Sequence, residues 1–118
     1  MEPTEWLMNN AGSVIRYRTA HEILGEPVTK LEKELLNSTL VLNWLGYLKP
    51  YFGASQLHNA KSEAFENTMG KLYEFGLRSG ISPLDRRIAP FLEWLKTKAH
   101  WFSRILVSGF LCMTGYSD

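Results

Sequence analysis

The chain has 118 residues, which is enough for one domain whose hydrophobic core needs neither a metal nor a disulfide. Thirteen basic and twelve acidic residues leave a formal charge of +1, which argues against binding of nucleic acid through a concentrated positive surface. The one cysteine has no intramolecular partner, and no apolar stretch is long enough to cross a membrane, so we expect a soluble cytoplasmic protein.

The N-terminal quarter predicts two helices. A short apolar segment covers 4–10, and too few turns are available for it to be stable alone. Ser13 is a suitable N-cap for a second helix over 14–24, which Gly25 is expected to end in the left-handed conformation.

Two further helices are predicted before the middle of the chain. Thr29 and Glu32 have the spacing of a capping box, so a helix is expected from 29 to about 36. The next helix should cover 39–48, because its apolar residues return on one face. This face comprises Leu40, Val41, Trp44, Leu45 and Leu48.

The second half predicts three helices after a connection without periodicity over 49–61. A helix over 62–75 should stop at Gly76. A helix start is favoured by Ser82, Pro83 and Asp85. The apolar run 101–113 is typical of a last helix with little polar face. We therefore predict an all-α fold of six or seven helices joined as antiparallel hairpins.

Two stretches carry a resemblance to a known family. The stretch 15–25, Ile-Arg-Tyr-Arg-Thr-Ala-His-Glu-Ile-Leu-Gly, resembles a motif near the start of prokaryotic proteins related to the prenyltransferase and squalene-cyclase (α/α) toroid. The stretch 65–95 is similar to one toroid unit: one helix ends in Leu-Tyr-Glu-Phe-Gly-Leu and a second closes on Phe-Leu-Glu-Trp-Leu. The resemblance implies that 1–118 is a single helical domain and the N-terminal segment of a larger toroid.

The catalytic motifs of that family are missing from this chain. Its cyclases protonate their substrate from an aspartate-rich motif, whereas the aspartates here are Asp85 and Asp118 alone. Its prenyltransferases bind zinc through Asp, Cys and His, and no such trio can be placed. The glutamine–tryptophan repeat of the cyclases is also missing, since Gln56 is the single glutamine. We therefore predict no catalytic residue, no metal and no cofactor.

The apolar ending predicts how such a domain is used. Residues 110–116 contain no charge, so this segment is expected to pack against the remaining chain, a second copy or another protein. The leading hypothesis is a non-catalytic or catalytically incomplete toroid-like domain. The alternatives are part of a terpenoid-cyclase-like or prenyltransferase-like enzyme that binds an apolar substrate, and a free-standing helical adaptor.

Aromatic and basic side chains are the candidate binding residues. Arg16 and Arg18 diverge by about 200° on a helix, so each would contact an anion separately or pair with an acid. The aromatic residues either line a cavity for an apolar small molecule or form the core. They are Trp44, Tyr47, Tyr51, Phe52, Trp94, Trp101 and Phe102.

Two other constellations receive structural interpretations. His21, Glu22 and Glu26 are residue types that bind metals, but Gly25 should end the helix before Glu26, so we interpret them as surface residues. Cys112 lies among apolar residues, where we expect a protonated thiol packed in the core rather than a nucleophile.

Overall fold

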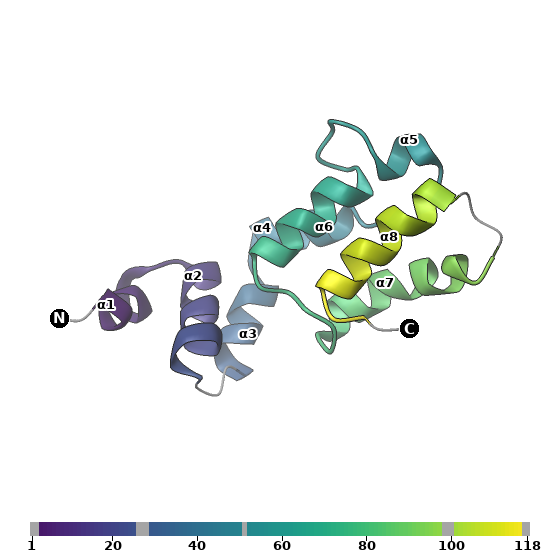
Figure 1. Cartoon of the computed structure of the whole chain (residues 1–118). Coiled ribbons are helices and arrows are strands. Elements are labelled where there is room, and N and C mark those ends of the chain that lie inside the picture. Colours follow the sequence, from purple (N-terminus) through teal and green to yellow (C-terminus); the bar gives the residue numbers. More distant parts are fainter. Residues whose placement is uncertain (1–2, 26–28, 51, 98–100, 117–118) are drawn as a thin grey trace. The chain divides into compact units, whose positions relative to one another are not determined.

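The structure, a computed structural model, describes residues 3–25, 29–50, 52–97 and 101–116. Within these ranges the chain is all-helical, as predicted, with eight α-helices, one π-helical segment and no strand (Figure 1). Their contacts divide the chain into two compact units, Met1–Leu42 and Asn43–Asp118, and each is described by itself. Within the described ranges, no helix has the length and hydropathy that crossing a membrane requires.

The first unit contains α1 (Pro3–Asn10), α2 (Ser13–Arg18), the π-helical segment η1 (Thr19–Leu24) and α3 (Thr29–Leu36). Helix α2 contacts both α1 and α3. The predicted bounds of α1 and α3 are close to those observed.

The helix predicted over 14–24 is correct in extent but wrong in type. From Thr19 onward the backbone is π-helical, and the Gly25 N–H donates to the carbonyl of Ala20, five residues back. Gly25 itself has φ 63°, the left-handed conformation expected of it. Ser13 is the first helical residue, and the N-cap is the extended Gly12, which provides no side-chain cap.

Helix α4 (Thr39–Gly46) ends two residues before its predicted end. Fewer residues are buried than the predicted face contained. Residues three and four apart share one side of a helix, whereas adjacent residues do not. Leu40, next to the buried Val41, is half exposed, whereas Leu45 and Leu48 are buried.

The second unit also contains α5 (Ala54–Leu57), α6 (Phe65–Glu74), α7 (Ser82–Leu95) and α8 (Trp101–Met113). Helix α8, yellow in Figure 1, contacts α5, α6 and α7. The bounds of α8 and the end of α7 match the prediction. The short α5 interrupts the stretch 49–61, which showed no helical period because a single turn is too short to produce one.

Aromatic rings connect the elements of the second unit. The Phe65 ring on α6 lies 4.8 Å from that of Phe91 on α7 and 6.0 Å from that of Phe110 on α8. Phe52 meets Phe91 edge to face at 5.2 Å and stacks on Trp94 at 5.1 Å. This continuous cluster links α6, α7 and α8, and offset or edge contacts of this kind add to the free energy of burial.

Helices α6 and α8 end in the same way. After α6, the Leu77 N–H donates to the Leu72 carbonyl, and Gly76 has φ 95°. After α8, the Tyr116 N–H donates to the Leu111 carbonyl, and Gly115 has φ 98°. Both are Schellman motifs, in which a left-handed glycine lets the chain satisfy the last carbonyl groups of the helix.

Candidate functional site

Helix α8 has two unlike faces. Its inner face is buried and consists of Ser103, Val107 and Leu111. We define the outer face as the residues of α8 that lie within about 80° of Gly109 around the helix axis. None of these residues is charged. The outer face consists of Trp101, Phe102, Ile105, Leu106, Gly109, Cys112 and Met113. The face turned away from the core is therefore no less apolar than the face that packs on it, the reverse of an ordinary surface helix.

The outer face is strongly exposed and is hollowed at its centre. Trp101 is 67% exposed and Ile105 is 65% exposed. A shallow open pocket of about 290 Å³ is lined by Ile105, Leu106, Gly109, Phe110 and Met113. A methyl group added at Gly109 would meet no atom within 4 Å, so the missing side chain leaves open space at this lining residue.

The C-terminal end of α8 is fixed by a set of hydrogen bonds that we call the C-terminal latch. The Ser79 N–H donates to the Thr114 carbonyl at 2.8 Å, and the Ser79 hydroxyl donates to the Gly115 carbonyl at 3.0 Å. The Tyr116 hydroxyl donates to Asp85 Oδ1 at 2.5 Å. Burial, together with the hydrogen bond to Asp85 and the charge of that carboxylate, raises the pKa of Tyr116 well above its ordinary value of 10.0. The latch holds α8 in place with its outer face open.

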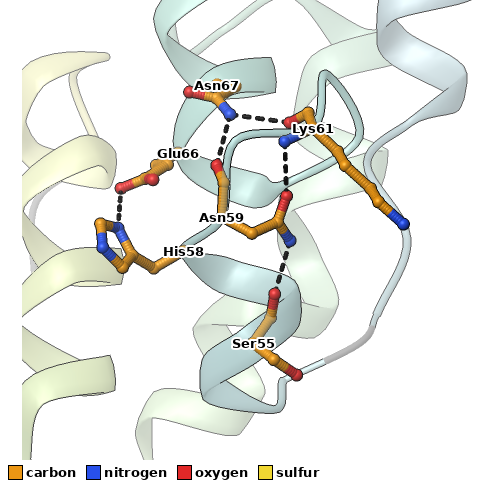
Figure 2. Close-up of polar contacts among 6 residues, drawn as sticks. All are labelled: Ser55, His58, Asn59, Lys61, Glu66 and Asn67. Atoms are coloured by element: carbon orange, nitrogen blue, oxygen red, sulfur yellow. Dashed lines mark hydrogen bonds and ion pairs between the residues drawn. The ribbon is translucent and has the colours of Figure 1, made fainter.

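A histidine–glutamate pair joins the segment after α5 to α6. His58 Nδ1 lies 2.7 Å from Glu66 Oε2 (Figure 2). The His58 and Phe102 rings also meet edge to face, with their centroids 5.8 Å apart. The His58 and Glu66 side chains share one hydrogen bond, which ties the segment after α5 to α6. The sequence did not show this pair, because the eight-residue separation crosses a loop and matches no helical spacing.

An asparagine clamp holds the same loop on α6. Asn67 Nδ2 donates to the carbonyls of Asn59 at 2.8 Å and Lys61 at 2.7 Å (Figure 2). Asn59 Oδ1 accepts from the Lys61 N–H at 2.7 Å, and its amide donates to the Ser55 carbonyl. The polar groups of the cluster thus satisfy one another, and they serve to fix the loop.

The structure distributes the candidate aromatic residues over three places. Trp44 and Tyr47 form an edge-to-face pair at 5.4 Å, and Trp101 and Phe102 form another at 6.1 Å on α8. Phe52 and Trp94 belong to the aromatic core, and Tyr51 lies outside the described residues.

One small pocket involves a candidate residue. Tyr47 lines a pocket of about 20 Å³ together with Leu48, Phe65 and Phe91, among others. That volume holds about one water molecule, so it offers no room for an apolar ligand. Binding of such a ligand by the seven aromatic residues stays a prediction.

Both candidate arginines pair with acids, as one of the two sequence interpretations expected. Arg16 Nη1 lies 3.0 Å from Glu34 Oε2, and Arg16 Nε donates to the Met8 carbonyl at 3.1 Å. Arg18 lies 3.0 Å from Glu22, one helical turn away. In these positions Arg16 connects α2 to α1 and α3, and anion binding by either arginine stays a prediction.

The expectation that Cys112 is a core residue is wrong, because its side chain is exposed. The neighbouring Leu111 occupies the inner face, and one residue further along a helix turns by about 100°, which places Cys112 on the outer face. Glu26, one of the residues considered for a metal, lies outside the described residues.

The described part of the chain contains no group of three His, Cys, Asp or Glu residues that is placed to hold a metal ion. His21, one of the residues considered for a metal, is exposed and stacks on Tyr17 at 5.7 Å.

Compared with protein-family models, with curated proteins and with solved structures, the chain matches none of them. Its function is therefore inferred from its own side chains and their geometry.

Proposed function

We propose that the chain is a non-catalytic helical domain that packs the outer face of α8 against another protein surface. The observation that carries this proposal is the reversed polarity of α8: Ser103 is buried on its inner face, while Trp101 and Ile105 are exposed on its outer face. Exposure of such side chains opposes solubility and is kept where a partner covers them.

The size of the outer face fits this proposal. Aromatic side chains present about 150–250 Å² each when fully exposed, so the exposed fractions of this face amount to about 400 Å² of apolar surface. A patch of about 300–600 Å² is the largest that a typical monomer exposes, and such patches are often functional. The absence of charged residues among the α8 side chains of this face favours a protein partner rather than a charged ligand.

We propose further, from the resemblance to an (α/α) toroid, that this domain is part of a larger helical ring. A domain that opens a larger helical ring would present an apolar edge to the next hairpin, and α8 is an apolar last helix of the described chain. The all-helical fold is compatible with this origin. Without the acidic and zinc-binding motifs of the family, the role that we propose for the domain is structural.

The test uses Cys112, which is the single cysteine and lies on the outer face of α8. Its alkylation rate is measured in cells that make the chain from its own gene and on the dilute purified chain. If a partner covers the face in nine-tenths of the molecules, alkylation in cells slows by about tenfold.

A reference site controls for reagent access. In a Cys112→Ser background, Ile23→Cys places a thiol at a position that is 65% exposed in the first unit. This thiol should react at the same rate in both settings. Equal alkylation rates for Cys112 in cells and in dilute solution would contradict the proposed function.

A further inference from the structure

We infer that the partner of the outer face of α8 is a second copy of this chain, whose α8 packs antiparallel on the first with Gly109 opposite Gly109. This inference rests on the proposed function and names the partner of the same surface. Three properties of the face carry it: its charge, its shape and its area.

The charge of the face suits pairing with itself. In a two-fold symmetric interface each patch meets its own copy, so a charged patch would bring like charges together. Arg104 is the one charged residue of α8, and it lies about 140° around the helix from Gly109, outside the contact. Two outer faces therefore meet without repulsion and without burying an unpaired charge.

The shape of the face is a ridge with a low centre. Trp101, Ile105, Gly109 and Met113 follow one another at intervals of four residues, the spacing of a ridge that packs into the groove of a neighbouring helix. At Gly109 the ridge drops, which lets two helix backbones approach closely. Antiparallel pairing then places Ile105 of each copy in the hollow beside Met113 of the other.

The chain's own fold gives no reason for a glycine at this position. Gly109 lies inside α8, where glycine is a poor helix former, and its φ is not positive. An added methyl group would meet nothing within 4 Å. The space that the missing side chain leaves would admit a backbone that approaches from outside the chain.

The area of the face predicts a weak, reversible dimer. Two faces of about 400 Å² each bury about 800 Å², which is below the 1,200 Å² of standard stable interfaces and typical of transient ones. We therefore expect association in the micromolar range or weaker, so that dilution separates the copies.

Sedimentation velocity over a wide range of protein concentration tests the inference. The wild-type chain should pass reversibly from monomer to dimer as concentration rises. Ile105→Glu buries an unpaired charge in the apolar hollow beside Met113 of the other copy, and it should weaken the dimer by about a hundredfold or more. Ile23→Glu is the matched control, since Ile23 is also 65% exposed, and it should leave the dimer intact.

A second pair of variants tests the role of Gly109. Gly109→Leu fills the hollow and should weaken the dimer, whereas Gly70→Leu, at a helical glycine of α6 that also has open space around it, should not. Circular dichroism confirms that each variant is folded. If Gly109→Leu and Gly70→Leu dimerise equally strongly, the two helices do not cross at Gly109.

Disulfide trapping tests the orientation. In the Cys112→Ser background, an oxidised mixture of Ile105→Cys and Met113→Cys should form the mixed disulfide, and each variant alone should not. Disulfides within either variant alone, without the mixed one, would show a parallel pair and overturn the antiparallel arrangement.

The outcomes separate this inference from the proposed function. A wild-type chain that stays monomeric at every concentration overturns the second copy as partner. If Cys112 is nevertheless protected in cells, the outer face has a different partner and the proposed function stands. If Cys112 is unprotected there as well, both fail.

Discussion

The C-terminal latch needs a residue without a side chain at Gly115. Its φ is 98°, and a methyl group there would lie 2.8 Å from the Ser79 hydroxyl oxygen. Gly115→Ala should therefore lower the free energy of unfolding by about 2 kcal/mol, from the left-handed backbone and the displaced Ser79 together. Urea denaturation measures this loss.

Gly80→Ala is the control for this prediction. Gly80 has φ 99° but open space around it, so its substitution should cost about 1 kcal/mol for the backbone alone. Equal losses in the two variants would show that the contact with Ser79 adds nothing.

From the raised pKa of Tyr116 we predict that the folded chain loses stability in alkaline solution. Its pKa in the folded chain is raised above 10.0, so the unfolded chain releases the phenol proton first as pH rises. The contribution of Tyr116 is fully present below pH 10 and is lost as pH rises above it. The free energy of unfolding should therefore fall more steeply between pH 9.5 and pH 11 in the wild type than in Tyr116→Phe. Parallel slopes in urea titrations would contradict the raised pKa.

At the residue scale, the sequence predicted what depends on neighbours along the chain. Gly25 and Gly76 have the left-handed conformations that helix ends require. The pairs His58–Glu66 and Tyr116–Asp85 were missed, because they join residues across loops and depend on how helices pack. Leu111-Cys-Met-Thr-Gly-Tyr116 does repeat the Schellman pattern of the α6 end, a signal that would have placed Tyr116 at a helix terminus.

The asparagine clamp is the feature of the α5–α6 connection that one substitution can test. Asn67→Asp keeps the shape of the side chain but replaces its two N–H donors with a carboxylate that faces two carbonyls. We expect a loss of about 1–3 kcal/mol in stability and faster amide exchange between residues 58 and 64. Hydrogen exchange measures the second effect.

Asn43→Asp, at an exposed asparagine of α4, is the control and should leave that loop unchanged. Unaltered exchange between residues 58 and 64 in Asn67→Asp would show that the clamp does not hold the loop.

At the element scale, apolar periodicity predicted the long helices well and the short ones poorly. The bounds 101–113 were correct because α8 is apolar at most positions, but the same property concealed which face is buried. Periodicity shows a face only where polar residues mark the opposite side. The π-helical turn at Thr19 was not predicted, because apolar periodicity over six residues does not distinguish an α turn from a π turn.

At the scale of whole units, substitution of Arg16 tests what holds the first unit together. It contacts Glu34 on α3 and the Met8 carbonyl on α1. Arg16→Gln should raise the exchange rates of amides in α1, α2 and α3, with a loss of about 1 kcal/mol or less because the pair is partly exposed. Arg18→Gln removes a pair within one helical segment and should affect α1 and α3 far less.

The division into two units was not visible in the sequence. No proline-rich or glycine-rich linker separates them, and the boundary falls inside α4, between Leu42 and Asn43. A boundary inside a helix leaves no change in composition, so only the distribution of contacts reveals it.

The C-terminal latch also has a kinetic consequence. Its hydrogen bonds join residues 31 and 36 positions apart, so the entropy of closing these loops opposes them until α7 and α8 are in place. We therefore expect these contacts to form after the folding transition state. Loosening the latch should therefore speed unfolding and leave the refolding rate nearly unchanged, which makes Tyr116 a determinant of the lifetime of the folded chain.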